Sequence, residues 1–151
     1  ARAKPVHVVD FQTCALSGGP GPKTREGDGQ VPEGLYEIDR LHPGSHYHLA
    51  LHVNYPNTQD RKLGRTGSAI MIHGDAVSIG CIALGDLGIE RLWAAVAARP
   101  PGTPRVQLHS FPQRGAAALA AQRDDAVGRF WHQLGRIERD FPEYGLAAAG
   151  R

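Results

Sequence analysis

The chain has 151 residues, of which 41% are hydrophobic and 21% are charged, and its formal net charge is +2. These values indicate a folded globular protein with enough chain to bury a core. The longest apolar stretches fall well short of the ~20 residues of a membrane-spanning helix, so this chain has no predicted membrane span. The basic residues are scattered and give no indication of nucleic-acid binding. Two cysteines exclude a disulfide-rich scaffold and a four-cysteine zinc site.

Turn-forming residues are concentrated in Ser17–Gly34, where nine of the 18 residues are glycine or proline. Such a run is a series of turns and not the interior of a helix or strand. Charged residues stand between these turns, and apolar segments follow closely on both sides. We interpret the run as an ordered surface loop within the domain, a common place for substrate contacts.

Short apolar or alternating segments predict strands around this loop. The clearest is His46–Val53, where apolar and polar residues alternate over eight positions, as in a half-buried strand. The other predicted strands are Val6–Phe11, Gly34–Ile38, Ala69–His73 and Arg105–Ser110.

The apolar period changes to that of a helix after residue 85. Ile89, Leu92, Trp93 and Val96 form one stripe, with Asp86 as the candidate N-cap and Pro100 as the stop. A second helical region runs from residue 115 to Pro142, with its apolar stripe at Val127, Phe130, Trp131, Leu134, Ile137 and Phe141. This order predicts a β-dominated α+β fold with a helical C-terminal cover.

The segment Ile70–Leu84 contains the residues best suited to chemistry. His73 ends a predicted strand and is followed by Gly74, which permits a sharp turn. Cys81 follows eight residues after His73, directly behind Gly80. An imidazole within ~3 Å of a thiol can form a reactive thiolate–imidazolium pair.

Backbone groups near this cysteine could complete such a site. The Cys81 N–H, with a neighbour from the Ser78–Gly80 turn, could bind an oxyanion, and Ser78 could orient the turn or donate a further hydrogen bond. From spacing alone, the alternative is equally open: Cys81 would be a small buried hydrophobe and His73 an ordinary strand-end histidine.

The pattern His73-Gly74 followed by Ser78-Ile79-Gly80-Cys81 resembles the active-site motif of the L,D-transpeptidase (YkuD-type) family. Three further blocks are similar to its YafK-like branch, in the same order: Ser17–Asp28, Val31–Tyr36 and Tyr55–Arg61. The gap of eight residues and Ala83, where most members have arginine, depart from the broader family but are similar to this branch.

The resemblance implies an L,D-transpeptidase-like mixed β-sandwich, with a catalytic domain at residues 5–110 and a helical C-terminal extension packed on it at residues 111–151. It implies that Cys81 is the nucleophile and His73 the base. Gly80 and Cys81 would supply the backbone around the oxyanion, and Ser78 would support it. No cofactor and no metal are implied.

The substrates implied by the resemblance are peptidoglycan stem peptides, attacked at a diaminopimelate carbonyl to form a thioester. An amine acceptor would give a crosslink in bacterial cell-wall remodelling or anchor a protein, and water would give hydrolysis of stem-peptide or protein–peptidoglycan links. A further alternative is a catalytically silent peptidoglycan-binding module. The implied location is the periplasm or cell envelope. The chain begins at Ala1 without a leader, which fits a processed or trimmed protein.

Donor peptides carry carboxylates, for which Lys23, Arg25 and Arg61 are candidate partners. The alternative is that each is solvated or paired with Glu26, Asp28 or Asp60.

Three other arrangements compete with this reading of the sequence. His46, His48 and His52 share one face of a predicted strand and could suggest a zinc site, although the outer two would lie roughly 13 Å apart. Cys14 is expected to be a buried structural thiol, with a Cys14–Cys81 disulfide as the alternative. The last helix could lie on a membrane surface, but we favour packing on the domain.

Overall fold

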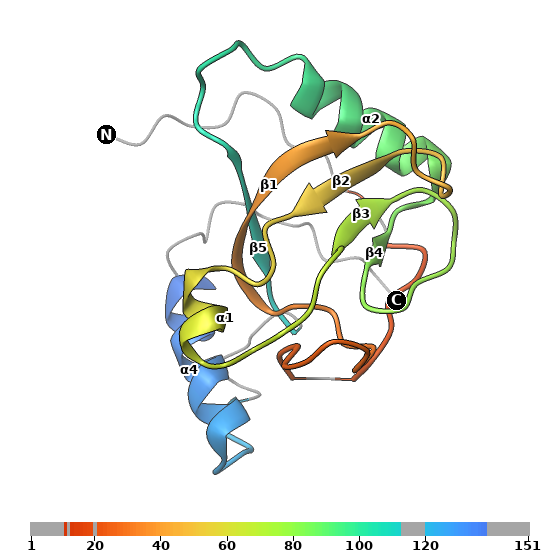
Figure 1. The fold of residues 1–151 in the computed structure, drawn as a ribbon. Helices are drawn as coiled ribbons and strands as arrows, with labels where there is room; N and C mark the ends of the chain where they lie inside the picture. Colours follow the sequence, from red (N-terminus) through yellow and green to blue (C-terminus); the bar gives the residue numbers. More distant parts are fainter. Residues whose placement is uncertain (1–10, 12, 20, 113–119, 139–151) are drawn as a thin grey trace. The chain divides into compact units, whose positions relative to one another are not determined.

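The computed structural model describes residues 11, 13–19, 21–112 and 120–138, and its ribbon is drawn in Figure 1. The chain divides into two compact units, one of which comprises residues 12–112 and contains the sheet. The last helix, α4 (Ala126–Glu138), belongs to the other unit. The predicted domain boundary at residue 110 and the packing of the extension on the domain stay predictions. No helix in the described ranges is long and apolar enough to cross a membrane.

Five strands form one mixed sheet in the order β4-β3-β2-β1-β5. The strands are β1 (Gly34–His42), β2 (Ala50–Val53), β3 (Met71–His73), β4 (Ile82–Ala83) and β5 (Val106–Ser110). All neighbouring pairs are antiparallel except β3 and β4, which run parallel. Residues 74–81 therefore carry the chain back from the end of β3 to the start of β4. The β-dominated α+β class is confirmed.

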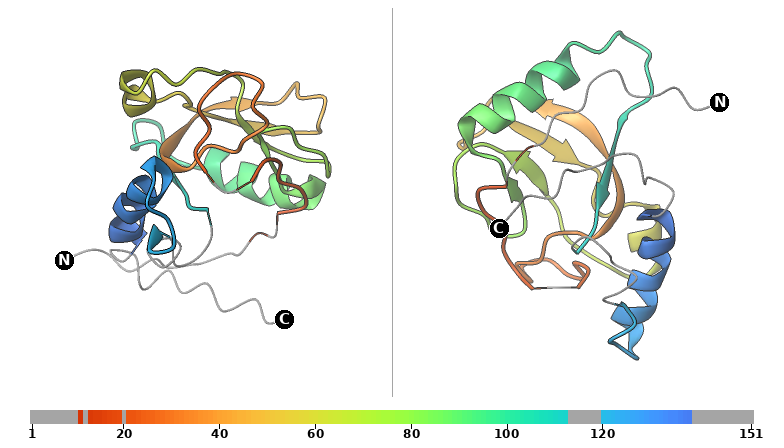
Figure 2. Two further views of the ribbon diagram at one scale, coloured as in Figure 1. Left: turned by 90° about the horizontal axis from the view of Figure 1, so that it is seen from below. Right: turned by 180° about the vertical axis from the view of Figure 1, so that it is seen from behind.

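Alternating side chains of the central strands form the core. Tyr36 and Ile38 of β1 are buried, as are Leu51 and Val53 of β2. The helix α2 (Gly85–Ala97) contacts β2 and β3, and its Ile89 is fully buried. Figure 2 shows α2 running beside these strands from two further directions. The alternation in the sequence predicted the burial of Leu51 and Val53, and the helical stripe predicted that of Ile89. Ala50, which the alternation assigned to the other side of the strand, is buried as well.

A short helix that the sequence analysis did not predict, α1 (Thr58–Lys62), follows β2. The side-chain oxygen of Asn57 caps the helix by accepting a hydrogen bond from the Asp60 backbone N–H. The Asp60 carboxylate in turn accepts one from the Asn57 backbone N–H, which completes a capping box. Asp60 is also paired with Arg65 at 2.8 Å and is only 2% exposed. The block Tyr55–Arg61 thus anchors a turn by a buried carboxylate.

The strand predicted at His46–Val53 is wrong in its first half, because β2 begins only at Ala50. His46 and Tyr47 lie in a turn, and His48 has a left-handed φ of 69°. The reason is topological: β1 and β2 are antiparallel neighbours, so the chain must reverse between them. Most of the strand predicted at Val6–Phe11 lies outside the described residues.

The N-cap predicted at Asp86 is also wrong. The helix α2 begins at Gly85, its N-cap position is Leu84, and that residue makes no side-chain capping bond. Asp86 lies in the first turn, where its carboxylate accepts a hydrogen bond from the Asp75 backbone N–H at 2.9 Å. A carboxylate in the first turn still complements the helix dipole.

The helix α4 is amphipathic, as predicted from the stripe in its sequence. Trp131 and Leu134 are buried in their unit. Asp125 precedes the helix and accepts a hydrogen bond from the Gly128 backbone N–H at 2.8 Å, which is a side-chain cap. The predicted end of the stripe at Phe141 lies outside the described residues.

Candidate active site

His73 occupies the last position of β3 and is 2% exposed. It pairs with Ala50 of β2 on one side and with Ala83 of β4 on the other. Both neighbours are buried alanines, so the flanking strands leave room for an imidazole between them. The ring of Tyr47 stacks on the imidazole, with 4.8 Å between the centroids and 34° between the planes. Tyr47 itself is 46% exposed and so lies between His73 and solvent.

A backbone contact fixes which nitrogen of His73 carries the proton. Nδ1 lies 2.6 Å from the carbonyl oxygen of Gly74. A carbonyl only accepts, so Nδ1 must donate, and in the neutral ring Nε2 is then an unprotonated base. No described buried side-chain nitrogen or oxygen lacks a partner. Nε2 makes no bond within the described residues, so it lies in the small exposed part of the ring.

Gly74 is required by close packing. A Cβ at this position would come within 2.6 Å of Asp86 Oδ1 and 2.7 Å of the Tyr47 carbonyl oxygen. The Gly74 N–H is shared between the carbonyls of Tyr47 and Leu49, each at 3.1 Å. These contacts join the turn that carries Tyr47 to the end of β3.

Cys81 lies directly before β4 and is partly exposed. The pairing of Ile72 with Ile82, extended by one residue, puts Cys81 beside Met71. Met71 and His73 are two residues apart and therefore face the same side of the sheet. Strand spacing and rise then put the Cα atoms of Cys81 and His73 roughly 8 Å apart on the diagonal.

The thiol of Cys81 makes no hydrogen bond with His73 in this conformation, in which both residues are described. It donates instead to the Ala69 carbonyl oxygen at 3.7 Å. Burial raises the pKa of the thiol, and a hydrogen bond from the Met71 backbone N–H and the charge of Lys23 only partly oppose this. Reaction would therefore require the sulfur to turn from Ala69 toward the imidazole.

The turn before Cys81 is held by two serines. Ser78 Oγ donates to the Cys81 carbonyl oxygen at 2.6 Å, so it closes the turn in which the sequence analysis placed it. Gly80 is buried and has a φ of +94°, which favours glycine. Its N–H donates to Ser17 Oγ. The Gly80 N–H is thus already bonded to another residue, and the oxyanion role expected of the Cys81 N–H stays a prediction.

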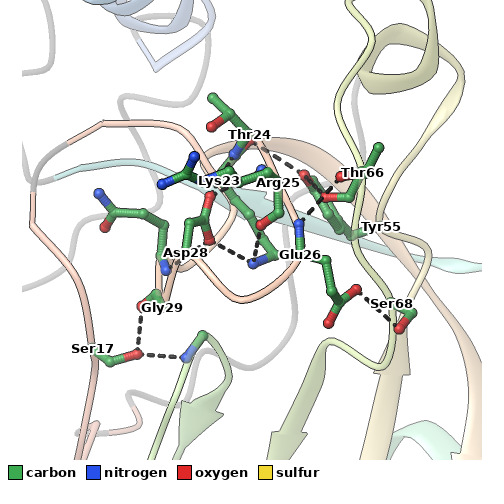
Figure 3. Close-up of polar contacts among 12 residues, drawn as sticks. Ser17, Lys23, Thr24, Arg25, Glu26, Asp28, Gly29, Tyr55, Thr66 and Ser68 are labelled. Atoms are coloured by element: carbon green, nitrogen blue, oxygen red, sulfur yellow. Dashed lines mark hydrogen bonds and ion pairs between the residues drawn. The ribbon is translucent and has the colours of Figure 1, made fainter.

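Lys23, a candidate substrate contact, is 4% exposed and pairs with Asp28 at 2.6 Å. This matches the alternative left open for Lys23, a pairing with a nearby carboxylate. Burial opposes ionisation of Asp28, but hydrogen bonds from Lys23 and three backbone amides hold the pKa of that carboxyl well below its ordinary value. Figure 3 shows this pair at the centre of the loop's polar contacts. Lys23 therefore shapes the loop and does not face solvent.

The two arginine candidates differ from Lys23. Arg25 is exposed in the same loop, where its backbone N–H binds Asp28. Arg61 is exposed on α1, and its guanidinium donates to the Pro56 carbonyl oxygen. Neither makes a contact with His73 or Cys81 within the described part of the chain. Their role as binding residues stays a prediction.

The three histidines considered for zinc do not converge. His48 pairs with Glu90 at 2.7 Å, and His52 pairs with Asp39 at 2.6 Å. Among the described residues, no three histidine, cysteine, aspartate or glutamate side chains are grouped so that they could hold a metal ion.

Cys14 is exposed, so its predicted burial is wrong. Its N–H donates to the Ala83 carbonyl oxygen, and Ala15 pairs with Ala83. This antiparallel register puts Cys14 about three residues, or roughly 10 Å, beyond Cys81, farther than a disulfide can span. Both thiols are free. Cys14 is exposed because its segment adds only an isolated bridge, from Ala15 to Ala83, to the edge strand β4.

Tyr47 and Ser17 are site residues that the sequence analysis did not name. Both stand far from Cys81 in the chain, and their contacts are made by tertiary packing. A cavity of about 700 Å³ opens at Tyr47 and is lined also by Asp75 and Asp86. The only sequence signal was that Ser17 opens one of the blocks shared with the YafK-like branch.

Comparisons with known proteins agree on one family. Residues 7–108 match the L,D-transpeptidase catalytic domain (YkuD). The chain is 41% identical over 128 residues to YafK of Escherichia coli strain K12, an L,D-transpeptidase by provisional assignment, and a protein of the same name from E. coli O157:H7 matches equally. These matches cover 82% of this chain and 52% of each relative, so the chain spans about half their length.

Solved structures share the fold. The K307A mutant of Pgp2, a helical cell shape determining protein of Campylobacter jejuni, superimposes with a TM-score of 0.56 at 25% identity, over 82% of this chain and 43% of that one. Another Pgp2 structure gives 0.56 at 22% identity, over 83% and 58%. The chain therefore belongs to the YkuD L,D-transpeptidase catalytic domain family.

Proposed function

We propose that this domain catalyses cysteine-dependent acyl transfer on peptidoglycan stem peptides, with Cys81 as the nucleophile and His73 as the base. The observation that carries the proposal is the Nδ1–H bond of His73 to Gly74, which leaves Nε2 as a base on the sheet face that Cys81 shares. Membership of the L,D-transpeptidase family and the similarity to Pgp2, a cell-shape protein, support a cell-wall substrate and a location in the cell envelope.

The first half of the proposed reaction forms a thioester. The Cys81 sulfur gives its proton to His73 Nε2 and attacks the carbonyl carbon of a diaminopimelate residue in the donor peptide. The negative charge that develops on the carbonyl oxygen is stabilised by the Cys81 N–H. The amide C–N bond then breaks, and the imidazolium returns the proton to the departing amine.

The second half depends on what attacks the thioester. An amine acceptor from another stem peptide or an attached protein loses a proton to His73, forms a new amide and releases the Cys81 thiol. Water would give a carboxylic acid instead. Ala83 stands where most of the family has arginine, and it is fully buried between His73 and Ala15. This position therefore offers an acceptor no cationic side chain. This observation keeps hydrolysis as the second candidate.

Incubation with disaccharide-tetrapeptides, followed by mass spectrometry, tests the proposal. Joined muropeptides would indicate transpeptidation, and addition of water would indicate hydrolysis. Cys81→Ala and His73→Ala should abolish either reaction, whereas Cys14→Ser should not. Turnover by Cys81→Ala at the wild-type rate would contradict the mechanism. Binding to sacculi without any turnover or thioester would instead support a silent binding module.

A further inference from the structure

Ser17 has no part in the reaction proposed above, yet its hydroxyl joins two segments of the site. It donates a hydrogen bond to the Gly29 carbonyl oxygen at 2.7 Å and accepts one from the Gly80 N–H. Figure 3 draws both bonds, one to the loop and one to the turn before the nucleophile. One side chain therefore uses both its donor and an acceptor to bridge residues that are far apart in the chain.

The surface that receives the turn is built from Gln30 and its partners. A Cβ on Gly80 would come within 3.2 Å of the Gln30 carbonyl oxygen, so the turn packs closely on the loop. Hydrogen bonds fix both the backbone and the side chain of Gln30. Its N–H binds Asp28 Oδ1 at 3.1 Å, and its side-chain oxygen accepts from the Gly19 N–H at 2.8 Å. Ser17 thus fastens the turn to a loop that is already fixed.

Gly80 stands directly before Cys81, so its orientation sets where the Cys81 N–H and Cβ begin. Its φ of +94° belongs to a region that glycine occupies readily among several others. Without a further contact, the backbone at Gly80 could adopt several conformations. A hydrogen bond to its N–H selects one of them. In strand register, the pairing of Ala15 with Ala83 extends to Ser17 opposite Cys81, which is consistent with this contact.

We propose that Ser17 is a positioning residue for Cys81: its hydroxyl, held between Gly29 and Gly80, fixes the turn that aims the thiol at the scissile carbonyl. This inference rests on the proposed function only in taking Cys81 as the nucleophile. A purely structural serine would affect the amount of folded protein. A positioning serine would affect the rate per folded molecule and the environment of the thiol.

The test uses Ser17→Ala, which removes both bonds, and Ser17→Thr, which keeps the hydroxyl. The matched control is Ser68→Ala, because Ser68 also binds a loop residue, Glu26, at 3.2 Å but makes no contact with Gly80. All variants carry Cys14→Ser, so that Cys81 is the only thiol. For each, the melting temperature, the kcat and KM for a disaccharide-tetrapeptide, and the rate of iodoacetamide labelling against pH are measured.

We expect Ser17→Ala to lower kcat about 10- to 100-fold, the range that a small misplacement of reacting groups can cost, with KM within about twofold. Its labelling profile should move to lower pH, because a loosened turn gives the buried thiol more water. Activity and small-reagent reactivity would then change in opposite directions. Ser17→Thr should recover most of kcat, and Ser68→Ala should match the parent.

Wild-type kcat in folded Ser17→Ala, or equal losses in Ser17→Ala and Ser17→Thr, would overturn the assignment of Ser17. If no protein turns over the muropeptide, the proposed function fails, but the labelling profile still decides the role of Ser17. A profile unchanged between the parent and Ser17→Ala would then count against it.

Discussion

Tyr47 lies against the imidazole of His73, with the two ring centroids 4.8 Å apart. The contact covers the proposed base on its solvent side, because His73 is 2% exposed and Tyr47 is 46% exposed. The stacked ring restricts rotation of the imidazole, while the Gly74 carbonyl holds its Nδ1. Two independent contacts therefore define the direction of Nε2.

Removal of the Tyr47 ring should weaken catalysis without preventing folding. An aromatic pair contributes about 0.5–1.5 kcal/mol beyond area burial, which corresponds to about a 2- to 12-fold loss of kcat/KM in Tyr47→Ala. Tyr47→Phe keeps the stacking and should stay within about twofold of the parent. The measurement is kcat/KM with a muropeptide substrate. Equal activities of the Ala and Phe variants would show that the stacking has no role.

The thiol of Cys81 should titrate above its ordinary pKa, because burial disfavours the thiolate more than Met71 and Lys23 favour it. In Cys14→Ser protein, the rate of iodoacetamide labelling should rise with pH. The midpoint of this rise should lie at a higher pH in the folded protein than in the same protein unfolded in urea. A raised pKa in the folded state also means that stability falls once pH exceeds the ordinary thiol pKa. That fall should be absent in Cys81→Ala. Coincident labelling curves for folded and unfolded protein would contradict this expectation.

The position of His73 could be predicted because it depends on local pattern. A buried apolar run ending at His73 and Gly74 marks the end of a strand, and β3 ends there. The turn at Ser78 could be read similarly, because serine and glycine commonly form turns. The parallel pairing of β3 with β4 could not be predicted in this way, because parallel neighbours usually need a longer connection than residues 74–81 provide.

The contacts of Ser17 and Tyr47 and the burial of Lys23 could not be predicted, because they depend on residues distant in sequence. In the loop, Lys23 and Arg25 look alike as isolated cations, yet one is buried and the other exposed. The difference arises because Lys23 is enclosed by Tyr55 and by the backbone at Gly67, where an added Cβ would lie 3.0 Å from its Cε. Neither contact has a signature in a single sequence.

The Lys23–Asp28 pair should be important for stability. Both side chains are largely buried, at 4% and 10% exposure, so loss of one partner leaves an uncompensated charge. Such a loss costs about 3–5 kcal/mol in the free energy of unfolding. We expect this for Lys23→Met, measured by urea denaturation, whereas Arg25→Met at an exposed position of the same loop should change it by less than about 0.5 kcal/mol. Similar effects of the two variants would contradict the assignment of a buried pair.

The same pair predicts a dependence of stability on pH. The lowered pKa of Asp28 means that its contribution is complete above the ordinary value of 3.8 and is lost as pH falls below it. The free energy of unfolding should therefore decline in acid for the parent. Asp28→Asn should be less stable at neutral pH and show a shallower decline below pH ~4. An equal acid slope in both proteins would rule out this role for Asp28.

Gly74 should tolerate no side chain. In Gly74→Ala the Cβ would lie 2.6 Å from Asp86 Oδ1 and 2.7 Å from the Tyr47 carbonyl oxygen, both too close. Overpacking of this kind costs about 1–3 kcal/mol in stability, measured by thermal or urea unfolding. The displaced turn would also move the carbonyl that holds His73 Nδ1, so turnover per folded molecule should fall as well. Gly44→Ala is the matched control, because no atom lies within 4 Å of its added Cβ.

A second variant separates the two clashes at Gly74. In the double variant Gly74→Ala/Asp86→Ala, the carboxylate is gone but the Tyr47 carbonyl remains in place. Because a backbone atom cannot move aside as a side chain can, the double variant should regain only part of the lost stability and little of the turnover. Full recovery would assign the strain to Asp86 alone. Stability of Gly74→Ala equal to that of Gly44→Ala would show that the end of β3 can shift to admit a side chain.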